Sequence, residues 1–164
     1  MLDKHTLDAA NYRDAMARYA GHVQIVTTAL GGARRGVTIT AACSVSDNPP
    51  TVLVCLNNGN LNNQIFFDSG IFALNTLGAS CQHLADAFSG RNSLTADERF
   101  ALGSWSTMVT GAPVLDTANV AFDCRVVDQK VTATHTVLFG EVQAIHSSPA
   151  NPALIYLDRG YRAI

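Results

Sequence analysis

Lysine is scarce in this sequence, and basic charge as a whole is low. The 164 residues include two lysines, Lys4 and Lys130, nine arginines scattered along the chain, and a net charge of −2. A surface that binds nucleic acid needs clustered positive charge opposite the phosphates. The composition therefore argues against a nucleic-acid partner.

Long hydrophobic runs are also missing. No segment approaches the roughly 18 apolar residues that a membrane span requires, and the first ten residues, MLDKHTLDAA, lack the apolar segment of an export signal. We expect a soluble, cytoplasmic protein that makes no contact with a membrane.

Paired cysteines are absent as well. The four cysteines stand far apart and form no CxxC motif, so their spacing predicts neither a metal site nor a disulfide framework. We expect buried, reduced thiols and no metal, with oxidation of one cysteine in a strand-like stretch as the alternative. The four are Cys43, Cys55, Cys81 and Cys124, and the alternative concerns Cys43.

The sequence lacks the fingerprints of nucleotide-binding folds. It has no GxGxxG or GxxxxGK[ST] motif, no alternation of strands and helices, and no internal repeat. These absences argue against a doubly wound parallel sheet. What the chain does have is 48% hydrophobic residues over a length that suits one domain, residues 1–164.

Residues 36–50, GVTITAACSVSDNPP, are the stretch around which the chain is organised. Apolar residues occupy odd positions from Val37 to Val45, while small or hydroxyl residues occupy the even ones. A period of two predicts a single strand with one buried face. The other face is bare enough for a flat ligand to approach the backbone, although close packing in a barrel wall explains the pattern equally well.

Strand and helix signals elsewhere predict a mostly β fold with short helices. About seven or eight strands and three or four helices favour an antiparallel, Greek-key-like β-barrel. Asp8 or Thr6 caps a first helix whose apolar stripe suits core cover or a subunit contact. The expected strands are residues 23–30, 36–46, 51–56, 71–77, 119–126, 134–146 and 153–157, of which 51–56 is expected to be buried on both faces. The other expected helices are a short one after residue 64, one over residues 79–90, and one that begins with a capping box at residues 95–98.

The loop of residues 57–64 has five asparagines in seven positions. Left-handed backbone at asparagine and at Gly59 would turn successive amides inward into an anion-binding nest, next to the N-terminus of a short helix. Phosphate is the expected ligand. An ordinary solvated loop has the same composition.

Six blocks run in fixed order through residues 12–161, nearly the whole chain. They read GVTITAACSVSDNPPTVLVCLN, IFALNTLGASCQHLADAFSG, ERFALGSW, TGAPVLDTANVAFDCRV, ATHTVLFGEV and IYLDRGY. Together they resemble the flavin reductase family, which has the FMN-binding split-barrel fold. Most similar are the small NADH-dependent FMN reductase components of two-component monooxygenases, and a corrin-ring reductase of cobalamin synthesis belongs to the same group.

The resemblance implies a flavin site. The strand of residues 36–46 would run beside the isoalloxazine ring and ribityl chain, and the asparagine loop and a second segment would hold the phosphate, with Arg91 supplying a charge-assisted bond. Asn60 and Asn62 stand where many members have serines. The implied cofactor-binding residues are Arg35, Gly36, Val37, Thr38, Thr40, Ala41, Cys43, Asn57, Asn58, Asn60, Asn62, Asn63, Ser89, Gly90 and Arg91. Exposed arginines in a hairpin, such as Arg35, are otherwise simply solvated.

The resemblance also places His135 near the nicotinamide, as the catalytic residue that orients it, with Arg159 and Tyr161 closing over the same cleft. A lone histidine in a strand is otherwise more often structural. The remaining histidines in strands or helices, His22, His83 and His146, have no such support, and we interpret them as structural or surface residues.

The resemblance implies hydride transfer from NADH or NADPH to FMN, with FAD as an alternative flavin, and delivery of reduced flavin to a partner monooxygenase. It also implies a homodimer. Two other functions remain open at this point. One is reduction of a bulky acceptor such as a cobalt corrinoid, and the other is flavin or haem binding without catalysis.

Overall fold

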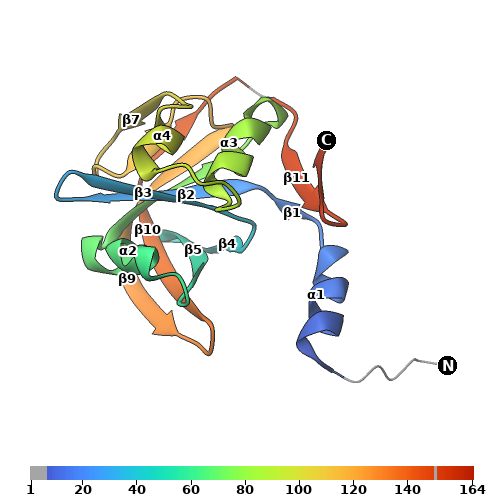
Figure 1. The fold of residues 1–164 in the computed structure, drawn as a ribbon. Helices are drawn as coiled ribbons and strands as arrows, with labels where there is room; N and C mark the ends of the chain where they lie inside the picture. The colour runs from blue at the N-terminus through green and yellow to red at the C-terminus, as the bar shows by residue number, and fades with distance from the viewer. Residues whose placement is uncertain (1–6, 150) are drawn as a thin grey trace.

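The computed structural model describes residues 7–149 and 151–164 (Figure 1). Its main element is a seven-stranded sheet in which every neighbouring pair is antiparallel. In sheet order the strands are β3 (Ala33–Ile39), β2 (Gln24–Leu30), β6 (Ile71–Thr76), β9 (Val120–Val131), β10 (His135–Ser147), β5 (Pro50–Asn57) and β4 (Ala42–Asp47). The two edge strands, β3 and β4, are joined by Thr40 and Ala41 alone, so the chain itself closes the barrel between them. The predicted antiparallel barrel is confirmed.

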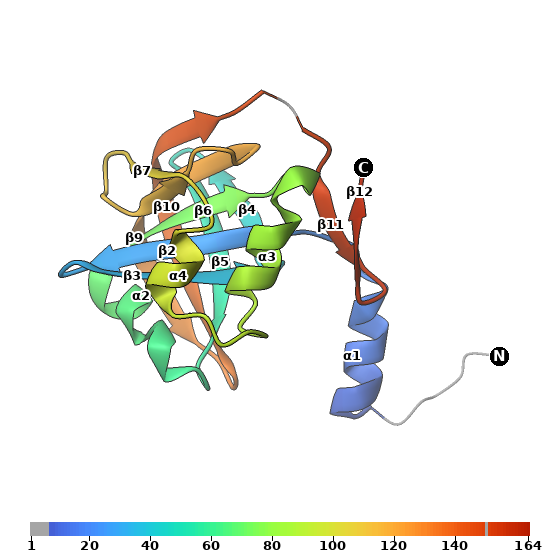
Figure 2. The same ribbon diagram turned by 45° about the horizontal axis from the view of Figure 1, so that its top comes forward.

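Smaller elements surround the barrel (Figure 2). A three-stranded sheet consists of β1 (Gly21–His22), β11 (Leu154–Leu157) and β12 (Gly160–Ala163), and a two-stranded one of β7 (Trp105–Thr107) and β8 (Pro113–Leu115). The helices are α1 (Ala9–Ala17), η1 (Leu61–Asn63), α2 (Gln64–Ser69), η2 (Ala79–Cys81), α3 (Gln82–Phe88) and α4 (Ala96–Phe100). None of the helices in these described ranges combines the length and the apolarity needed to cross a membrane.

The cap predicted at Asp8 of α1 is present, since its side chain accepts from Asn11 N at 2.8 Å, whereas Thr6 lies outside the described residues. The helix α1 has no buried side chain, so it does not cover the core.

The stretch of residues 36–50 forms two strands, and the prediction of one half-buried strand is wrong. β3 ends at Ile39 and β4 begins at Ala42 on the opposite edge of the sheet. Cys43 and Val45 are exposed, so the odd positions do not form a buried face. The alternation continues across the break because both edge strands have small, partly solvated residues on both faces.

The prediction that residues 51–56 are buried on both faces is also wrong. Val52, Val54 and Leu56 point into the barrel and are buried, whereas Leu53 and Cys55 point outward and are half-buried. Within residues 7–149 and 151–164, no helix or strand covers the outward face of β5 completely.

Two clusters of buried side chains hold the fold together. One fills the barrel and includes Phe66, Phe72 and Leu138. The other lies between the sheet and the pair α3 and α4, where Phe88 and Phe100 meet edge to face with ring centroids 5.1 Å apart. Figure 2 shows α3 and α4 lying over β2 and β3. These two helices therefore stand directly beside β3.

Gly36 allows this close approach. A Cβ atom at position 36 would lie 2.6 Å from Cε1 of Phe88, well inside the contact distance of two carbons. The glycine thus sets the depth of the groove between β3 and α3.

Candidate active site

A polar cavity of about 470 Å³ lies between β3, the asparagine loop and the segment that joins α3 to α4. Its walls combine guanidinium, amide and hydroxyl groups. The polar side chains that line it are Arg35, Asn60, Asn62, Ser89, Thr95 and Arg99. Such a set of donors suits a phosphate group.

Arg35 and Arg99 make this cavity strongly positive. Arg35 donates from Nε and Nη2 to Oδ1 of Asn63, at 3.3 and 3.2 Å, and Nε of Arg99 is buried without a hydrogen-bond partner. Among the described residues, neither arginine has an ion-pair partner. Asp97, the nearby carboxylate, lies 3.6 Å from Arg34 instead. Two unneutralised guanidinium groups at one cavity favour an anionic ligand.

Burial lowers the pKa of Arg35, and the neighbouring charge of Arg99 lowers it further. Arginine nevertheless stays protonated in proteins, so this pKa shift reports the burial of a cation, and then its repulsion by a second cation, rather than a loss of charge. A bound anion would relieve the repulsion.

Local structure places Arg99 at the cavity. The predicted capping box forms: Thr95 Oγ1 accepts a hydrogen bond from the Glu98 backbone, and Glu98 Oε2 accepts one from the Thr95 backbone. Phe100 anchors α4 in the core. The sequence pattern predicted only a helix cap at residues 95–98, and neither Arg99 nor Thr95 was among the predicted site residues. The sequence feature that could have identified Arg99 is its position beside an aromatic residue on a predicted one-turn helix.

The asparagine loop lines the cavity, but its backbone conformation differs from the predicted one. None of residues 57–64 has a positive φ, so the predicted nest of left-handed residues is wrong. Instead Asn57 Oδ1 accepts a hydrogen bond from Gly59 N, at 2.7 Å, and Asn60 Oδ1 accepts one from Asn62 N, at 3.1 Å. Because asparagine side chains satisfy these amides, turns of this kind need no left-handed backbone.

A second cavity, of about 230 Å³, adjoins the first along β3. Ser89 lines both, and residues from Arg35 to Thr40 line one or the other, so the two cavities are neighbours along β3; we call them together the groove. The other walls of the second cavity are Val23, Thr38, Ile39, Arg91, Tyr156 and Tyr161. The groove therefore combines a larger, positive end with a smaller end that two tyrosines and Arg91 border.

Arg91 belongs to the second cavity. Its guanidinium lies beside the Tyr156 hydroxyl, a hydrogen bond that raises the pKa of Arg91. The rings of Tyr156 and Tyr161 meet edge to face, 5.5 Å apart. Burial raises the pKa of Tyr161, and the nearby carboxylate of Asp86 raises it further, so this phenol stays neutral well above neutral pH. A bond from Arg91 to a phosphate stays a prediction.

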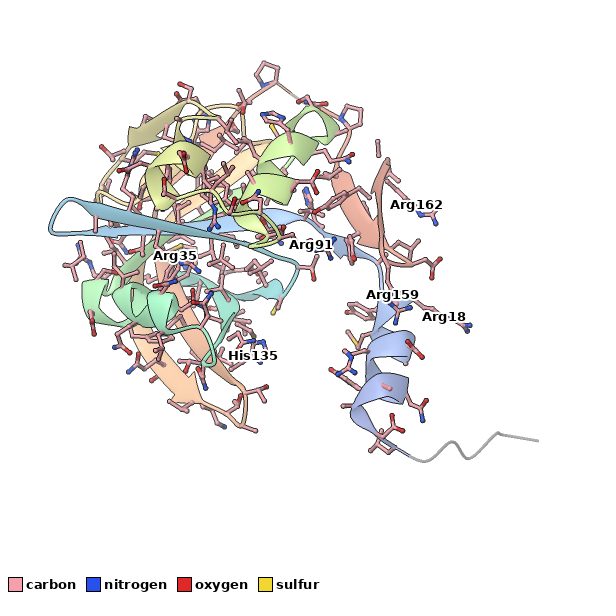
Figure 3. All side chains as sticks on the ribbon, viewed as in Figure 1. Arg18, Arg35, Arg91, His135, Arg159 and Arg162 are labelled. Atoms are coloured by element: carbon pink, nitrogen blue, oxygen red, sulfur yellow. The ribbon has the colours of Figure 1, made fainter. Side chains whose placement is uncertain are left out.

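His135 opens β10 directly opposite Asn57 on β5. Its Nδ1 lies 2.8 Å from Thr134 Oγ1, and Asn58 N donates to the Thr134 carbonyl at 2.9 Å. These contacts place the imidazole at the asparagine loop (Figure 3). His135 itself lines neither cavity of the groove. Arg159 also lines neither, and it lies in the turn between β11 and β12, paired with Asp14 of α1.

The other histidines have the structural or surface positions that we expected. His22 Nε2 lies 2.9 Å from the Leu77 carbonyl oxygen, and His146 Nε2 lies 3.0 Å from that of Asp116. His83 is exposed on α3.

The thiols differ in exposure, so the prediction of four buried cysteines is wrong for two of them. Cys43 is exposed and Cys55 is half-buried, whereas Cys81 and Cys124 are buried. Burial raises the pKa of the Cys124 thiol to about 12. Burial, and then the neighbouring Cys43, raise the pKa of Cys55.

At a protein concentration low enough to keep the chain monomeric, we expect a thiol reagent such as DTNB at pH 8 to modify Cys43 rapidly and Cys55 slowly, because reactivity requires access and a thiolate. Cys81 and Cys124 should react only after unfolding in guanidinium chloride. A Cys43→Ser variant should lose the fast phase alone. Four thiols that react at one rate in the native protein would contradict this ordering.

Comparison with known proteins agrees with this geometry. A family model described as "Flavin reductase like domain" matches residues 16–164. The chain is 44% identical over 162 residues to FMN reductase (NADH) RutF 2 of Methylorubrum extorquens strain PA1, covering 99% of this chain and 93% of that protein. It is also 44% identical over 154 residues to FMN reductase (NADH) RutF of Stutzerimonas stutzeri strain A1501, covering 94% and 87%.

A solved structure supports the same conclusion. BorF, the flavin reductase component of a bacterial two-component tryptophan halogenase, superposes with a TM-score of 0.87 at 25% identity, covering 96% of this chain and 98% of BorF. The resemblance drawn from the six sequence blocks is thus confirmed. The chain belongs to the flavin reductase family.

Proposed function

We propose that this protein transfers a hydride from NADH to FMN and supplies the reduced flavin to a separate oxygenase. The observation that carries the proposal is the unneutralised arginine pair at one end of a groove that continues along β3. Relatives named FMN reductase (NADH), and BorF as the reductase component of a two-component halogenase, support the two substrates and the delivery step.

The donors of the first cavity fit the phosphate of FMN. Arg35 and Arg99 would supply its two charge-assisted contacts, and Asn60, Asn62 and Ser89 would add neutral donors. Thr38 and Thr40, which line the second cavity with short side chains, would let the flat ring lie close to the backbone. When bound, FMN supplies the hydride-accepting ring, and the protein contributes position and exclusion of water.

His135 would orient the nicotinamide from the asparagine-loop side, and Tyr161 would border the groove from the other. Neither needs to transfer a proton, because the hydride passes directly between the two substrates. Arg159, held by Asp14, would act on the groove only through a movement of the hairpin that carries it.

Replacing His135 by alanine should raise the KM for NADH and lower kcat, each by about tenfold, as expected for one lost positioning contact. The KM for FMN should change less than threefold. His83→Ala, at an exposed position on α3, is the matched control and should behave as the wild type. Steady-state assays with both substrates varied provide the values. An unchanged KM for NADH and an unchanged kcat would remove His135 from the site.

The proposed function is tested by steady-state NADH oxidation with added FMN varied, together with anaerobic mixing of enzyme, FMN and NADH. We expect saturation in FMN and full loss of flavin absorbance. Flavin that binds but does not bleach with NADH or NADPH would show a flavin-binding protein instead. If a cobalt corrinoid competed with FMN as the preferred acceptor, reduction of a bulky acceptor would replace flavin supply as the function.

We also propose a homodimer in the cytoplasm. Free thiols, four in the described residues, fit a reducing compartment. An outward-facing patch on β4, β5 and β10 suits burial against a second copy. We call this patch the outer apolar face, and it consists of Cys43, Val45, Leu53, Cys55, Val137 and Phe139. None of its residues belongs to either core cluster.

A further inference from the structure

Another cavity, of about 360 Å³, lies at one end of the barrel, and we call it the barrel mouth. Its walls come from the strands β2, β4, β5, β6, β9 and β10. It shares no lining residue with either cavity of the groove. Cys43, which the resemblance places among the flavin-binding residues, lines the barrel mouth and not the groove. The barrel mouth is therefore a separate cavity for which hydride transfer has no use.

The barrel core forms the floor of the barrel mouth. Val52 and Leu74 belong to the buried cluster that fills the barrel, and Phe122 and Val142 pack against that cluster. Ile145, which is 61% exposed, continues the apolar surface to the rim. A ligand here meets aliphatic and aromatic side chains instead of the arginines of the groove. Apolar walls with a few polar groups are typical of small-molecule sites.

Gln24 interrupts this apolar surface. It lies two residues before Val26 on β2, so both side chains point into the barrel. Gln24 lines the barrel mouth, is only 8% exposed, and its Oε1 has no hydrogen-bond partner. Burial of an unpartnered amide oxygen is unfavourable, and a leucine at this position would avoid it. Because the terminal torsion of glutamine is soft, the amide can turn its oxygen toward a donor in the cavity.

The charge of the barrel mouth is opposite to that of the groove. Asp47 lines it, whereas no lysine, arginine or histidine does. Among the residues that the structure describes, Asp47 has no ion-pair partner. An unneutralised carboxylate repels an anion and attracts a cation. The electrostatics therefore disfavour phosphates and carboxylates and favour a ligand with a positive group.

We propose that the barrel mouth binds a small aromatic amine. Its ring packs on Phe122 and its aliphatic neighbours, an N–H group donates to Gln24 Oε1, and its ammonium group lies toward Asp47. FMN and NADH do not meet this description, because both carry phosphate, for which the groove has its arginines. The proposal does not rest on the proposed function.

An amide NMR titration of isotopically labelled protein with tryptamine, without flavin or NADH, tests the site. Tryptamine combines an aromatic ring, N–H donors and an ammonium group. We expect saturable shifts confined to the walls of the barrel mouth, with a dissociation constant of about 1 mM or lower. Indole-3-acetate, which has a carboxylate in place of the ammonium group, should bind at least about tenfold more weakly. Shifts that do not saturate, shifts that are centred elsewhere, or equal affinity for the two compounds would overturn the proposal.

Gln24→Leu removes the acceptor and nearly keeps the side-chain volume. Its affinity for tryptamine should fall about five- to tenfold, as expected for one lost hydrogen bond. Gln143→Leu is the matched control, because Gln143 lies on the same barrel, in β10, and does not line the barrel mouth. Its affinity should equal that of the wild type. Unchanged affinity in Gln24→Leu, or an equal loss in both variants, would contradict the assignment of Gln24 as the acceptor.

Thermal unfolding of ligand-free Gln24→Leu tests whether the amide oxygen is unpartnered. The melting temperature should stay the same or rise, because replacing an unsatisfied buried polar group by an apolar one is neutral or stabilising. A lower melting temperature would mean that the protein or an ordered water already satisfies Gln24, which would overturn the proposal.

A competition titration separates the barrel mouth from the flavin site. Saturating FMN should leave the dissociation constant of tryptamine unchanged, because the two cavities share no lining residue. Displacement of tryptamine by FMN would assign the barrel mouth to the flavin and overturn the proposal. Since tryptamine binding is measured without turnover, its failure would leave the proposed function standing.

Discussion

Replacing Arg99 by glutamine is expected to raise the KM for FMN by about 10- to 100-fold and to leave kcat at saturating FMN within about twofold. A hydrogen bond to a charged group contributes about 1.5–3 kcal/mol, and each 1.4 kcal/mol is a factor of ten. The phosphate is remote from the reacting ring. Weaker phosphate binding therefore destabilises the enzyme–FMN complex and the transition state equally, which raises KM and leaves kcat unchanged. Steady-state kinetics with FMN varied at saturating NADH measure the effect.

Two comparisons make this result specific. Arg34→Gln is the matched control, because Arg34 lies in the same region but pairs with Asp97 and stacks 4.4 Å above the Phe100 ring. Its KM for FMN should stay within about threefold of the wild type. Riboflavin, which lacks the phosphate, should lose little affinity in Arg99→Gln. An equal loss for riboflavin and FMN would mean that Arg99 supports the fold rather than the phosphate.

Replacing Gly140 by alanine is expected to destabilise the protein by about 2–3 kcal/mol, within the range for overpacked cores. A Cβ atom there would lie 2.4 Å from Cζ of Phe72 and 2.8 Å from Cβ of Cys124, and both side chains are fully buried. At this chain length the melting temperature should fall by roughly 5–10 °C.

Gly160→Ala provides the matched control for thermal unfolding, because the nearest atom to a Cβ there is 3.9 Å away. Its melting temperature should stay within about 2 °C of the wild type, which is the usual range for a surface substitution. If both variants melted at the wild-type temperature, the close packing of β10 on Phe72 would be contradicted.

Much of the fold could be predicted because local signals agreed with the final arrangement. The Gly31–Gly32 pair between two expected strands is a hairpin signal, and both residues have positive φ; the predicted capping box at Thr95 also forms. Gly140 lies at a register shift in β10, and a glycine inside a strand is a sequence signal for such a bulge. Each of these features depends on a few neighbouring residues, so the sequence alone is enough to predict it.

Tertiary closure was harder to predict. The break at Thr40 and Ala41 interrupts a perfect alternation, and only the return of the chain to the far edge of the sheet requires it. The strand β12 has four residues and follows a left-handed turn at Asp158 and Arg159. Aspartate is among the residues that adopt this conformation most readily, but arginine is not. Short strands of this kind have too few residues to show a period.

The candidate site was predicted in part. The resemblance brought Arg35, Asn60, Asn62 and Ser89 together, and the structure places all four at one cavity. Arg99 was missed because an unneutralised cation is visible only when its three-dimensional neighbours are known. The asparagine loop was misjudged because asparagine can satisfy a backbone amide with its side chain as readily as it can adopt a left-handed conformation.

The measurement that tests the central claim most directly is an anaerobic assay of NADH with FMN and riboflavin, each varied in turn and followed by loss of flavin absorbance. The two arginines should give FMN a KM about 100-fold lower than that of riboflavin, with similar kcat for both, because the ring that receives the hydride is the same. Flavin that never bleaches with NADH, or equal KM values for FMN and riboflavin, would contradict the account.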